Sequence, residues 1–303
     1  MRNAGPILAV VAAIFAIWYA AVPFMNVKET LTDLERAGAV VVPDTPIERR
    51  DASSIGLVLS NSFAIPATYA QARPRLPAPH QVAQDLWKTT VQKNITSKRS
   101  LIYHGWITLS ATLLGFALGT GAGILLAVGI VHSRAMDMSV MPWAIVSQTI
   151  PIIALAPMIV VVLYSVGLQG LLPKAVISAY LSFFPVVVGM VKGLRSPDQM
   201  QMDLLKTYHA NNAQGFWKLR LPSSTPYLFA SLKIGVAAAM VGAIVAELPV
   251  QGGGLGNRML TGSYYGQMVQ IWSALVLAAA LAASLVLLIG LAQRLALKRM
   301  GLI

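Results

Sequence analysis

Six long apolar stretches constrain the fold of this chain more than any other feature. They lie at about residues 5–25, 106–132, 139–165, 175–193, 227–248 and 270–293. An α-helix of about 20 apolar residues crosses the hydrocarbon core of a bilayer. Only 11% of the residues are charged, against about 25% in a typical soluble protein. None of the stretches alternates as a barrel strand does, so the sequence predicts an all-α membrane protein with six transmembrane helices.

The first stretch, "AGPILAVVAAIFAIWYAAVPFM", has two possible interpretations. One Arg precedes it, and its apolar run is long for the core of a signal peptide. No clean small-x-small cleavage site follows the run. We therefore expect residues 1–25 to form a retained transmembrane helix, with a removed signal peptide as the alternative.

The net charge of +12 is explained by topology. If six spans alternate from a cytoplasmic N-terminus, the two short outer loops contain only Lys174 and Arg258 as basic residues. Most other basic residues near the spans then lie inside, as the positive-inside bias requires. Both termini are therefore expected in the cytoplasm and residues 26–105 outside, and the basic excess does not call for a nucleic-acid partner.

Residues 26–105 form a polar insert. "VKETLTDLERAGAV" has helical spacing, and "PHQVAQDLWKTTVQ" reads as an amphipathic helix. Between them, "IGLVLSNSFAIPATYA" is interrupted by polar residues and by Pro66, so we expect it to pack on the outer membrane surface. A transmembrane core is expected at residues 106–296, followed by a short cytoplasmic tail at 297–303.

Two spans carry features typical of transport bundles. The second contains Gly115, Gly119 and Gly123, a small-residue spacing that allows close helix crossing. The third contains Pro151 and Pro157 beside Gln148, and a helix broken near mid-membrane is typical of a translocation pathway. Gln148, Pro151, Pro157 and, near the outer end, Tyr164 are therefore candidate pathway residues.

Glu247 ends the fifth span, and "GGGLG" follows it at 252–256. An acid inside a membrane bundle is a candidate functional group, whereas one at the membrane edge is simply interfacial. The glycines fit neither nucleotide-binding pattern, so we expect a flexible re-entrant loop. The chain has no Cys, and its four His are scattered. The sequence therefore predicts neither catalytic residues nor a metal site.

The polar segment 195–225, here called the elbow, separates the fourth and fifth spans. Ser196, Pro197 and Gln199 resemble the cap, first residue and capping-box partner of a helix. "ANNAQG" is expected to break or cap that helix, and Ser223–Thr225 to cap the fifth span with Pro226 as its first residue. Such a structured elbow either lies on anionic lipid or docks a partner protein.

The elbow "DLLKTYHANNAQGFWKLRLP" resembles the loop signature of a known family. The chain is similar to the permease subunits of bacterial type I ATP-binding-cassette importers, in the nitrate, sulfonate and taurine branch. "QTIPIIALAPMIVVVLYSVG" and "VGAIVAEL…GGGLG" are also in the style of that branch, and the resemblance covers about residues 74–296. Leu204 and Leu205 replace the two Ala of the signature, and His209 replaces a Gly where a tight turn is expected.

The resemblance implies half of an importer. An ATPase dimer that binds ATP and Mg would dock on the elbow, and a periplasmic binding protein would deliver the substrate. A second permease subunit, forming a homodimer with this chain, would complete the pathway in the inner membrane. This chain itself would be no enzyme and bind no cofactor. The implied coupling residues are Asp203, Tyr208, His209, Ala210, Asn211, Asn212, Gly215, Trp217, Leu221 and Pro222.

Two questions stay open at the level of sequence, namely the substrate and the class of transporter. The branch carries small anions such as sulfonates and nitrate, and also heterocyclic vitamin precursors. An ion-driven secondary transporter is the alternative class; it predicts ionisable groups inside spans, for which only Glu247 and Lys233 qualify.

Overall fold

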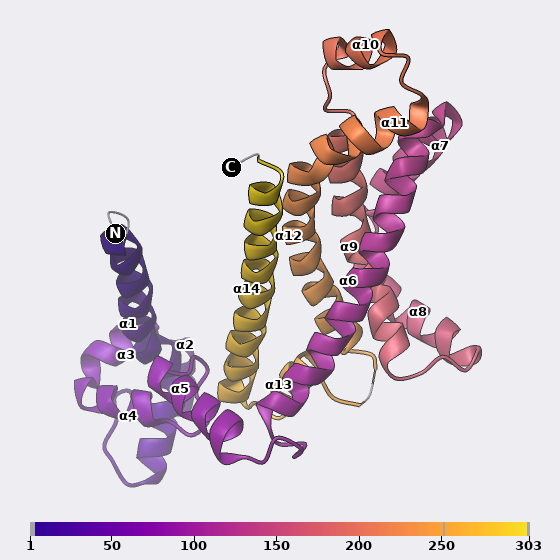
Figure 1. Ribbon diagram of the computed structural model, residues 1–303. Coiled ribbons are helices and arrows are strands. Elements are labelled where there is room, and N and C mark those ends of the chain that lie inside the picture. The colour runs from indigo at the N-terminus through magenta and orange to yellow at the C-terminus, as the bar shows by residue number, and fades with distance from the viewer. Residues whose placement is uncertain (1–3, 251, 302–303) are drawn as a thin grey trace. The chain divides into compact units, whose positions relative to one another are not determined.

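The computed structural model describes residues 4–250 and 252–301, and every regular element in these ranges is helical (Figure 1). The α-helices are α1 (Ala4–Arg36), α2 (Pro46–Asp51), α3 (Ser54–Ser60), α4 (Ile65–Ala70), α5 (Pro79–Trp87), α6 (Leu101–His132), α7 (Arg134–Ser147), α8 (Ile152–Ser165), α9 (Leu171–Leu194), α10 (Gln199–Thr207), α11 (Asn212–Gly215), α12 (Leu221–Ala246), α13 (Leu255–Tyr264) and α14 (Met268–Arg299). Short turns of other helix types are η1 (Ser62–Ala64), η2 (Lys88–Gln92) and η3 (Phe216–Arg220).

The predicted spans correspond to the long helices. Helices α1, α6, α9, α12 and α14 are each long and apolar enough to cross a membrane. The third predicted span, residues 139–165, corresponds to the pair α7 and α8, bent by 104° at the break between them. The all-α membrane fold is thus confirmed, with five single-helix spans and a sixth when the bent pair α7 and α8 is counted as one span.

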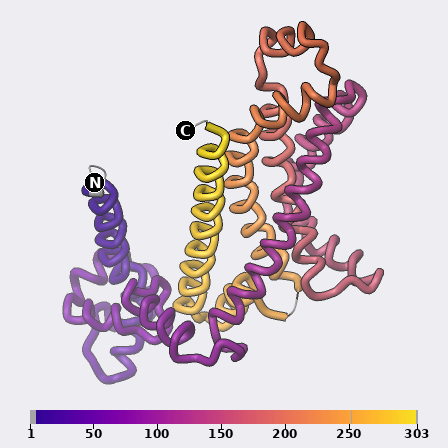
Figure 2. Tube along the Cα trace, viewed as in Figure 1, coloured from indigo at the N-terminus to yellow at the C-terminus, as the bar shows by residue number. Residues whose placement is uncertain are grey.

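The chain separates into two compact units. The first contains the residues up to 101 together with 258–275, and the second contains 102–257 and the residues from 276 onward. The tube in Figure 2 follows the chain through both. Each unit has its own buried core, so each is described separately below.

In the first unit, the polar end of α1 is covered by the short helices that follow it. Val27 and Leu31 of α1 pack with Leu57 and Val58 of α3. The "IGLVLSNSFAIPATYA" segment therefore supplies part of this core, and its Pro66 lies in the first turn of α4 instead of interrupting a helix. Asn26 is fully buried and exchanges hydrogen bonds with the backbone of Leu76, which fixes the extended segment beside α1.

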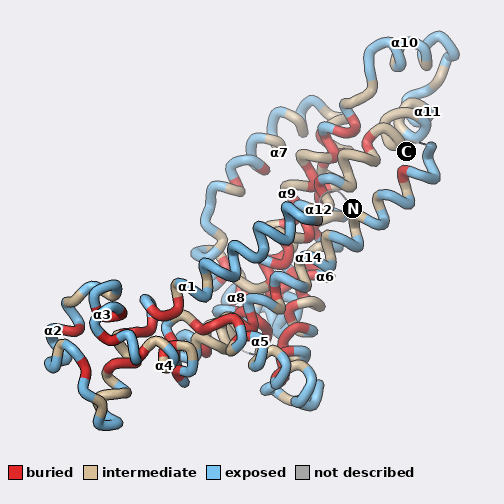
Figure 3. Tube along the Cα trace, turned by 90° about the vertical axis from the view of Figure 1, so that its left-hand side faces the viewer, coloured by how far each residue is buried: buried red, intermediate tan, exposed pale blue. Residues whose placement is uncertain are grey.

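In the second unit, α9 and α12 form the buried centre. Half of the α9 span is buried, and Figure 3 shows buried residues along α9 and α12. Only 11% of the α14 span is buried, so most of its apolar surface is available to lipid. A core cluster at one end of the unit joins α6 and α7 to α9 through Ile130, Ala144 and Met190.

The glycine series of α6 lies against α9. A Cβ added to Gly119 would lie 2.1 Å from Ser182 Oγ, and one added to Gly115 would lie 2.4 Å from Ser178 Cβ. Only glycine permits this separation of the two backbones. The close helix crossing that the spacing predicts is confirmed.

Candidate functional site

The elbow begins with α10, whose cap differs from the predicted one. The helix starts at Gln199 with Asp198 as its N-cap, and the backbone N–H of Asp198 donates to Gln201 Oε1 at 3.2 Å. The Ser196 hydroxyl instead donates to the Gly193 carbonyl at 2.8 Å. The prediction that Ser196 caps a helix from 197 is wrong, because Ser196 satisfies a carbonyl at the end of α9.

His209 makes the turn that ends α10. Its φ of 54° is the one left-handed value at a non-glycine residue in the described ranges. The His209 N–H donates to Lys206 O at 2.9 Å, and the Ala210 N–H donates to Leu205 O at 3.0 Å. This pair of bonds is the Schellman arrangement, which usually has Gly at this position. The tight turn therefore forms with His in place of Gly.

After the turn, α11 is capped on its own. The Gln214 N–H donates to Asn211 Oδ1 at 2.8 Å, and the Asn211 N–H donates to Gln214 Oε1 at 2.9 Å. These reciprocal bonds satisfy two backbone donors that a helix start leaves without partners. Helix α10 thus ends before "ANNAQG", consistent with the expected break, and this segment also opens α11, which was not expected.

The elbow then runs into α12 without a break. The turn η3 leads directly to Leu221, and Pro222 occupies the first turn of α12. Pro226 lies inside this helix, so the predicted helix start at Pro226 is wrong. Because Pro lacks an N–H, it fits a first turn easily; the helix here begins one Pro earlier.

One side of the elbow is attached to the helix bundle. Phe216 and Leu221 pack on the core cluster of α6, α7 and α9. The rings of Phe216 and His132, the last residue of α6, lie 5.3 Å apart. An ion pair of 2.9 Å joins Arg195 to Asp137 of α7. A movement of the elbow would therefore be transmitted to three helices.

The other side of the elbow presents apolar and aromatic side chains to solvent. Met200, Leu204 and Tyr208 are exposed at 78%, 57% and 77%, and Trp217 at 65%. The spacing predicts that the first three share one face of α10. Leu221 is instead half-buried against the bundle. The exposed aromatic candidates for contact with a partner are therefore Tyr208 and Trp217. The other exposed coupling candidates are Asp203, His209, Asn211 and Asn212, whereas Ala210, Gly215 and Pro222 are half-buried.

Asp203 lies on α10 within the elbow. Lys206 donates to its Oδ1 at 2.9 Å, and Gln199 donates to the same atom at 3.3 Å. The hydrogen bond from Lys206 lowers the pKa of the Asp203 carboxyl below its ordinary value. The residue at the family's Glu position is therefore an exposed anion paired within its own helix.

The predicted pathway residues of the third span lie on both sides of one helix break. Gln148 is the C-cap of α7, and Pro151 is the N-cap of α8. Pro157 lies inside α8, which continues to Ser165, so only the first proline interrupts the span. The Gln148 Nε2 atom is buried and has no hydrogen-bond partner among the described residues. Tyr164 is 37% exposed near the end of α8.

Glu247 occupies a buried polar cluster that closes the glycine loop onto the bundle. Its Oε1 accepts from the Thr108 hydroxyl, and its Oε2 accepts from the Gly256 N–H, each at 2.8 Å. Thr108 Oγ1 also accepts from the Leu255 N–H at 2.9 Å. Glu247 and Thr108 are fully buried. The carboxylate therefore holds α6, the end of α12 and the loop together.

Two further side chains hold the same loop. Lys174 of α9 donates to the Gly253 carbonyl at 2.9 Å, and the Gly254 N–H donates to His104 Nδ1 at 3.0 Å. A Cβ on Gly254, whose φ is 117°, would lie 2.1 Å from Glu247 Cδ. Sequence reasoning missed Lys174, His104 and Thr108. The only available signal was that each is polar within or beside an apolar stretch.

Together, the helices and the attached elbow define a polytopic membrane protein of the transporter class. Residues 119–301, more than half of the chain, match the family described as binding-protein-dependent transport system inner membrane component. The chain belongs to this family, and is therefore a multi-pass inner-membrane transport subunit. The resemblance to importer permeases is confirmed.

Three relatives show the range of the family. A probable ABC transporter permease protein of Haemophilus influenzae is 31% identical over 66% of this chain and 77% of its own length. The formylaminopyrimidine transport permease protein of Halalkalibacterium halodurans is 34% identical over 61% and 71%. The riboflavin transport system permease protein of Chloroflexus aurantiacus is 29% identical over 73% and 78%.

Proposed function

We propose that this chain is the membrane permease of an ATP-driven importer and that its elbow docks the ATPase. The observation that carries the proposal is the two-sided elbow. Tyr208 and Trp217 are exposed, while Phe216 and Leu221 pack on the bundle. Aromatic anchors with a polar rim are typical of docking surfaces. ATP and Mg would bind to the partner, whose movements the elbow would pass to α6, α7 and α9.

The coupling surface is proposed to extend over the turn between α10 and α11. Asp203, His209, Ala210, Asn211, Asn212, Gly215 and Pro222 complete it with the aromatic pair. Residues 207–217 would lie closest to the ATPase, and the elbow and the C-terminal end of α14 project at the same end of the second unit (Figure 2). Lys298 and Arg299 in the last turn of α14 support a cytoplasmic position for this end. With six spans, the N-terminus would then also be cytoplasmic.

The substrate pathway is proposed to follow the break between α7 and α8. A buried Gln148 Nε2 without a partner is costly unless something fills its hydrogen bond, and a passing solute or water would do so. Pro151, Pro157, Tyr164 and Glu247 are proposed to shape the pathway, with Glu247 acting through the loop that it holds. Alternating access would open this region to each side in turn.

A second permease subunit is proposed as a further partner. Helix α8 exposes Ile153, Met158 and Val161 at 65–68%. A second copy of this chain would cover this apolar surface in place of lipid. A periplasmic binding protein would deliver the substrate. Relatives named for formylaminopyrimidine and riboflavin are 34% and 29% identical to this chain, whereas relatives named for aliphatic sulfonates and nitrate are 22% and 24% identical. This difference in identity favours a heterocyclic vitamin or vitamin precursor as the substrate.

Uptake into proteoliposomes tests the proposed energy source. The chain would be reconstituted with the proteins that co-purify with it, and the uptake of radiolabelled formylaminopyrimidine and riboflavin would be measured. Uptake that requires ATP and persists when ionophores collapse ion gradients supports the importer. Uptake without ATP that stops with the ion gradient would instead identify a secondary transporter.

A further inference from the structure

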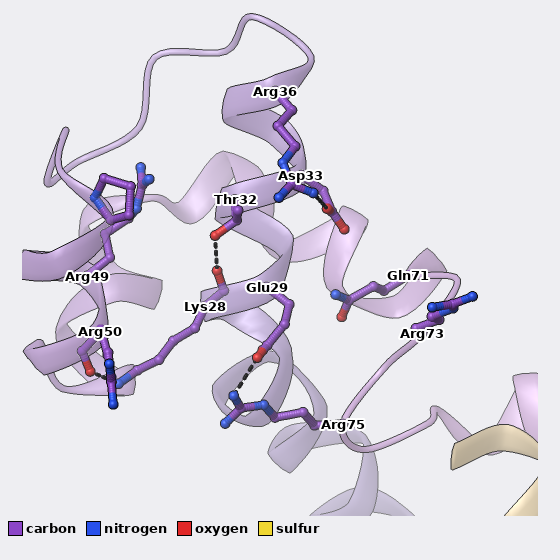
Figure 4. A pocket seen from close by; sticks show the side chains of 11 residues that line it. Lys28, Glu29, Thr32, Asp33, Arg36, Arg49, Arg50, Gln71, Arg73 and Arg75 are labelled. Carbon is purple, nitrogen blue, oxygen red and sulfur yellow. Dashed lines mark hydrogen bonds and ion pairs between the residues drawn. The ribbon is translucent and has the colours of Figure 1, made fainter. Parts of the chain in front are cut away.

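A polar groove of about 430 Å³ crosses the polar end of α1 in the first unit (Figure 4). Its floor is formed by Lys28, Thr32 and Arg36, which follow one another at the four-residue spacing of a helix face. Its walls are α2 on one side and the segment 71–75 on the other. All of these residues precede the family match at 119–301, so the family assigns them no role.

The lining is strongly basic. Six cationic side chains face two carboxylates, Glu29 and Asp33. The cations are Lys28, Arg36, Arg49, Arg50, Arg73 and Arg75. Clustered arginines attract oxyanions because the guanidinium fork matches phosphate and carboxylate geometry.

Some of these cations already have partners and two do not. Arg75 pairs with Glu29 Oε1 at 2.5 Å, and Lys28 donates to the Arg50 carbonyl at 2.7 Å. The guanidinium groups of Arg50 and Arg73 have no partner among the described residues. Figure 4 shows Arg50 on the α2 wall of the groove and Arg73 on the wall formed by the segment 71–75. The groove therefore offers an unpaired cation on each side.

Two buried atoms in the lining indicate what a ligand would need. Arg49 is 2% exposed, and it forms an ion pair with Glu35, which is not part of the groove lining. The Nε–H of Arg49 has no acceptor in the described structure. Glu29 Oε2 is buried and has no donor there. A buried polar group without a hydrogen-bond partner is unfavourable, because it has lost its contact with water. A ligand with an anionic oxygen and a nearby hydroxyl would satisfy both.

The groove also lies where a membrane ends. Helix α1 is continuous from Ala4 to Arg36, and its apolar part ends at about residue 25. At about 1.5 Å per residue, Lys28 lies one turn beyond the hydrocarbon core. This is the level of the phospholipid headgroups.

We propose that this groove binds a phosphate-type oxyanion that carries a neighbouring hydroxyl, with the unpaired guanidinium groups of Arg50 and Arg73 holding its charge. The same chemistry is found in a phosphatidylglycerol headgroup and in a small soluble phosphate ester. This inference does not depend on the proposed transport function, because the groove contains none of the elbow or pathway residues.

The test uses the full chain with its co-purifying partners in phosphatidylcholine nanodiscs. Phosphatidylcholine provides a phosphate without the hydroxyl. One arm titrates radiolabelled glycerol 3-phosphate by equilibrium filtration. The other arm adds phosphatidylglycerol to the lipid mixture and measures by mass spectrometry the lipid retained after exchange into detergent. The variants are Arg50→Gln and Arg73→Gln, separately and together.

Lys93→Gln is the matched control, since it removes one exposed positive charge from the same unit outside the groove. Saturable binding of glycerol 3-phosphate that falls at least tenfold in the double variant, but not in the control, supports the site with a soluble ligand. Selective retention of phosphatidylglycerol with the same loss supports the lipid source. No saturable binding in either arm, or equal binding in all variants, would overturn the proposal.

Discussion

The Thr108 hydroxyl donates to Glu247 Oε1 at 2.8 Å, joining two residues that are 139 positions apart in the sequence. Both side chains are fully buried. The other carboxylate oxygen accepts from the Gly256 N–H. The end of the fifth span is thus fastened to the second span and to the glycine loop by one side chain.

Removal of this hydrogen bond should destabilise the second unit. Thr108→Val leaves Glu247 Oε1 and the Leu255 N–H without their partner, and unsatisfied buried polar groups cost about 1–3 kcal/mol. We expect a lower midpoint of thermal unfolding in detergent. The control is Thr120→Val in the same helix, because the buried Thr120 hydroxyl oxygen has no partner among the described residues. Equal midpoints for the two variants would contradict the role of the Glu247 cluster.

The close crossing of α6 and α9 should tolerate no side chain at Gly119. In Gly119→Ala the new Cβ would meet Ser182 Oγ at 2.1 Å and Ala179 O at 2.8 Å, and overpacking of this kind costs about 1–3 kcal/mol. Gly121→Ala, two residues away, meets nothing within 4 Å. We expect thermal unfolding in detergent to separate the variants, with only Gly119→Ala destabilised. A stable Gly119→Ala protein would show that the helices do not cross at this distance.

The turn at His209 should become more stable with the family's own residue. A left-handed conformation costs an L-amino acid about 1–2 kcal/mol, and His209→Gly removes that strain, although the unfolded chain gains freedom in return. We expect slower amide hydrogen exchange over residues 199–210 in His209→Gly and faster exchange in the β-branched His209→Val.

Gly215→Ala is the control for the turn. Gly215 has helical backbone angles and open space around its Cα, so its substitution should leave exchange over 199–210 unchanged. Slower exchange in His209→Val than in the unchanged protein would contradict the assigned turn.

Much of the fold follows from local sequence patterns. Apolar length located all six spans, and the glycine spacing identified the face of α6 that meets α9, because these features depend on neighbours along one helix. The cap of α10 was misplaced by two residues, since Ser196 and Asp198 are both good caps and the choice depends on the end of α9. Pro157 was expected to interrupt the third span, but the break in that span lies before Pro151, and Pro157 lies inside α8.

The parts that sequence reasoning missed depend on contacts between distant segments. Lys174 was counted as a loop charge, but it reaches the Gly253 carbonyl 79 residues away. Nothing in the periodicity of either segment indicates that pairing. The polar groove of the first unit was also not predicted, because α1, α2 and the segment 71–75 meet only after the insert folds.

The central claim is that Tyr208 and Trp217 anchor an ATPase, and co-purification tests it most directly. The tagged chain would be extracted gently from its host membranes, and the ATPase recovered with it would be quantified. The variants are Tyr208→Ala, Trp217→Ala and both together. The control is Trp106→Ala, because Trp106 is 66% exposed on α6. Trp106 lies near the start of α6, whereas the elbow contacts His132 at its other end. We expect a P-loop ATPase in about equal amount with the unchanged chain and the control, and at least a tenfold loss with the double variant. An ATPase retained equally by the double variant, or none recovered with any form of the chain, would contradict the account.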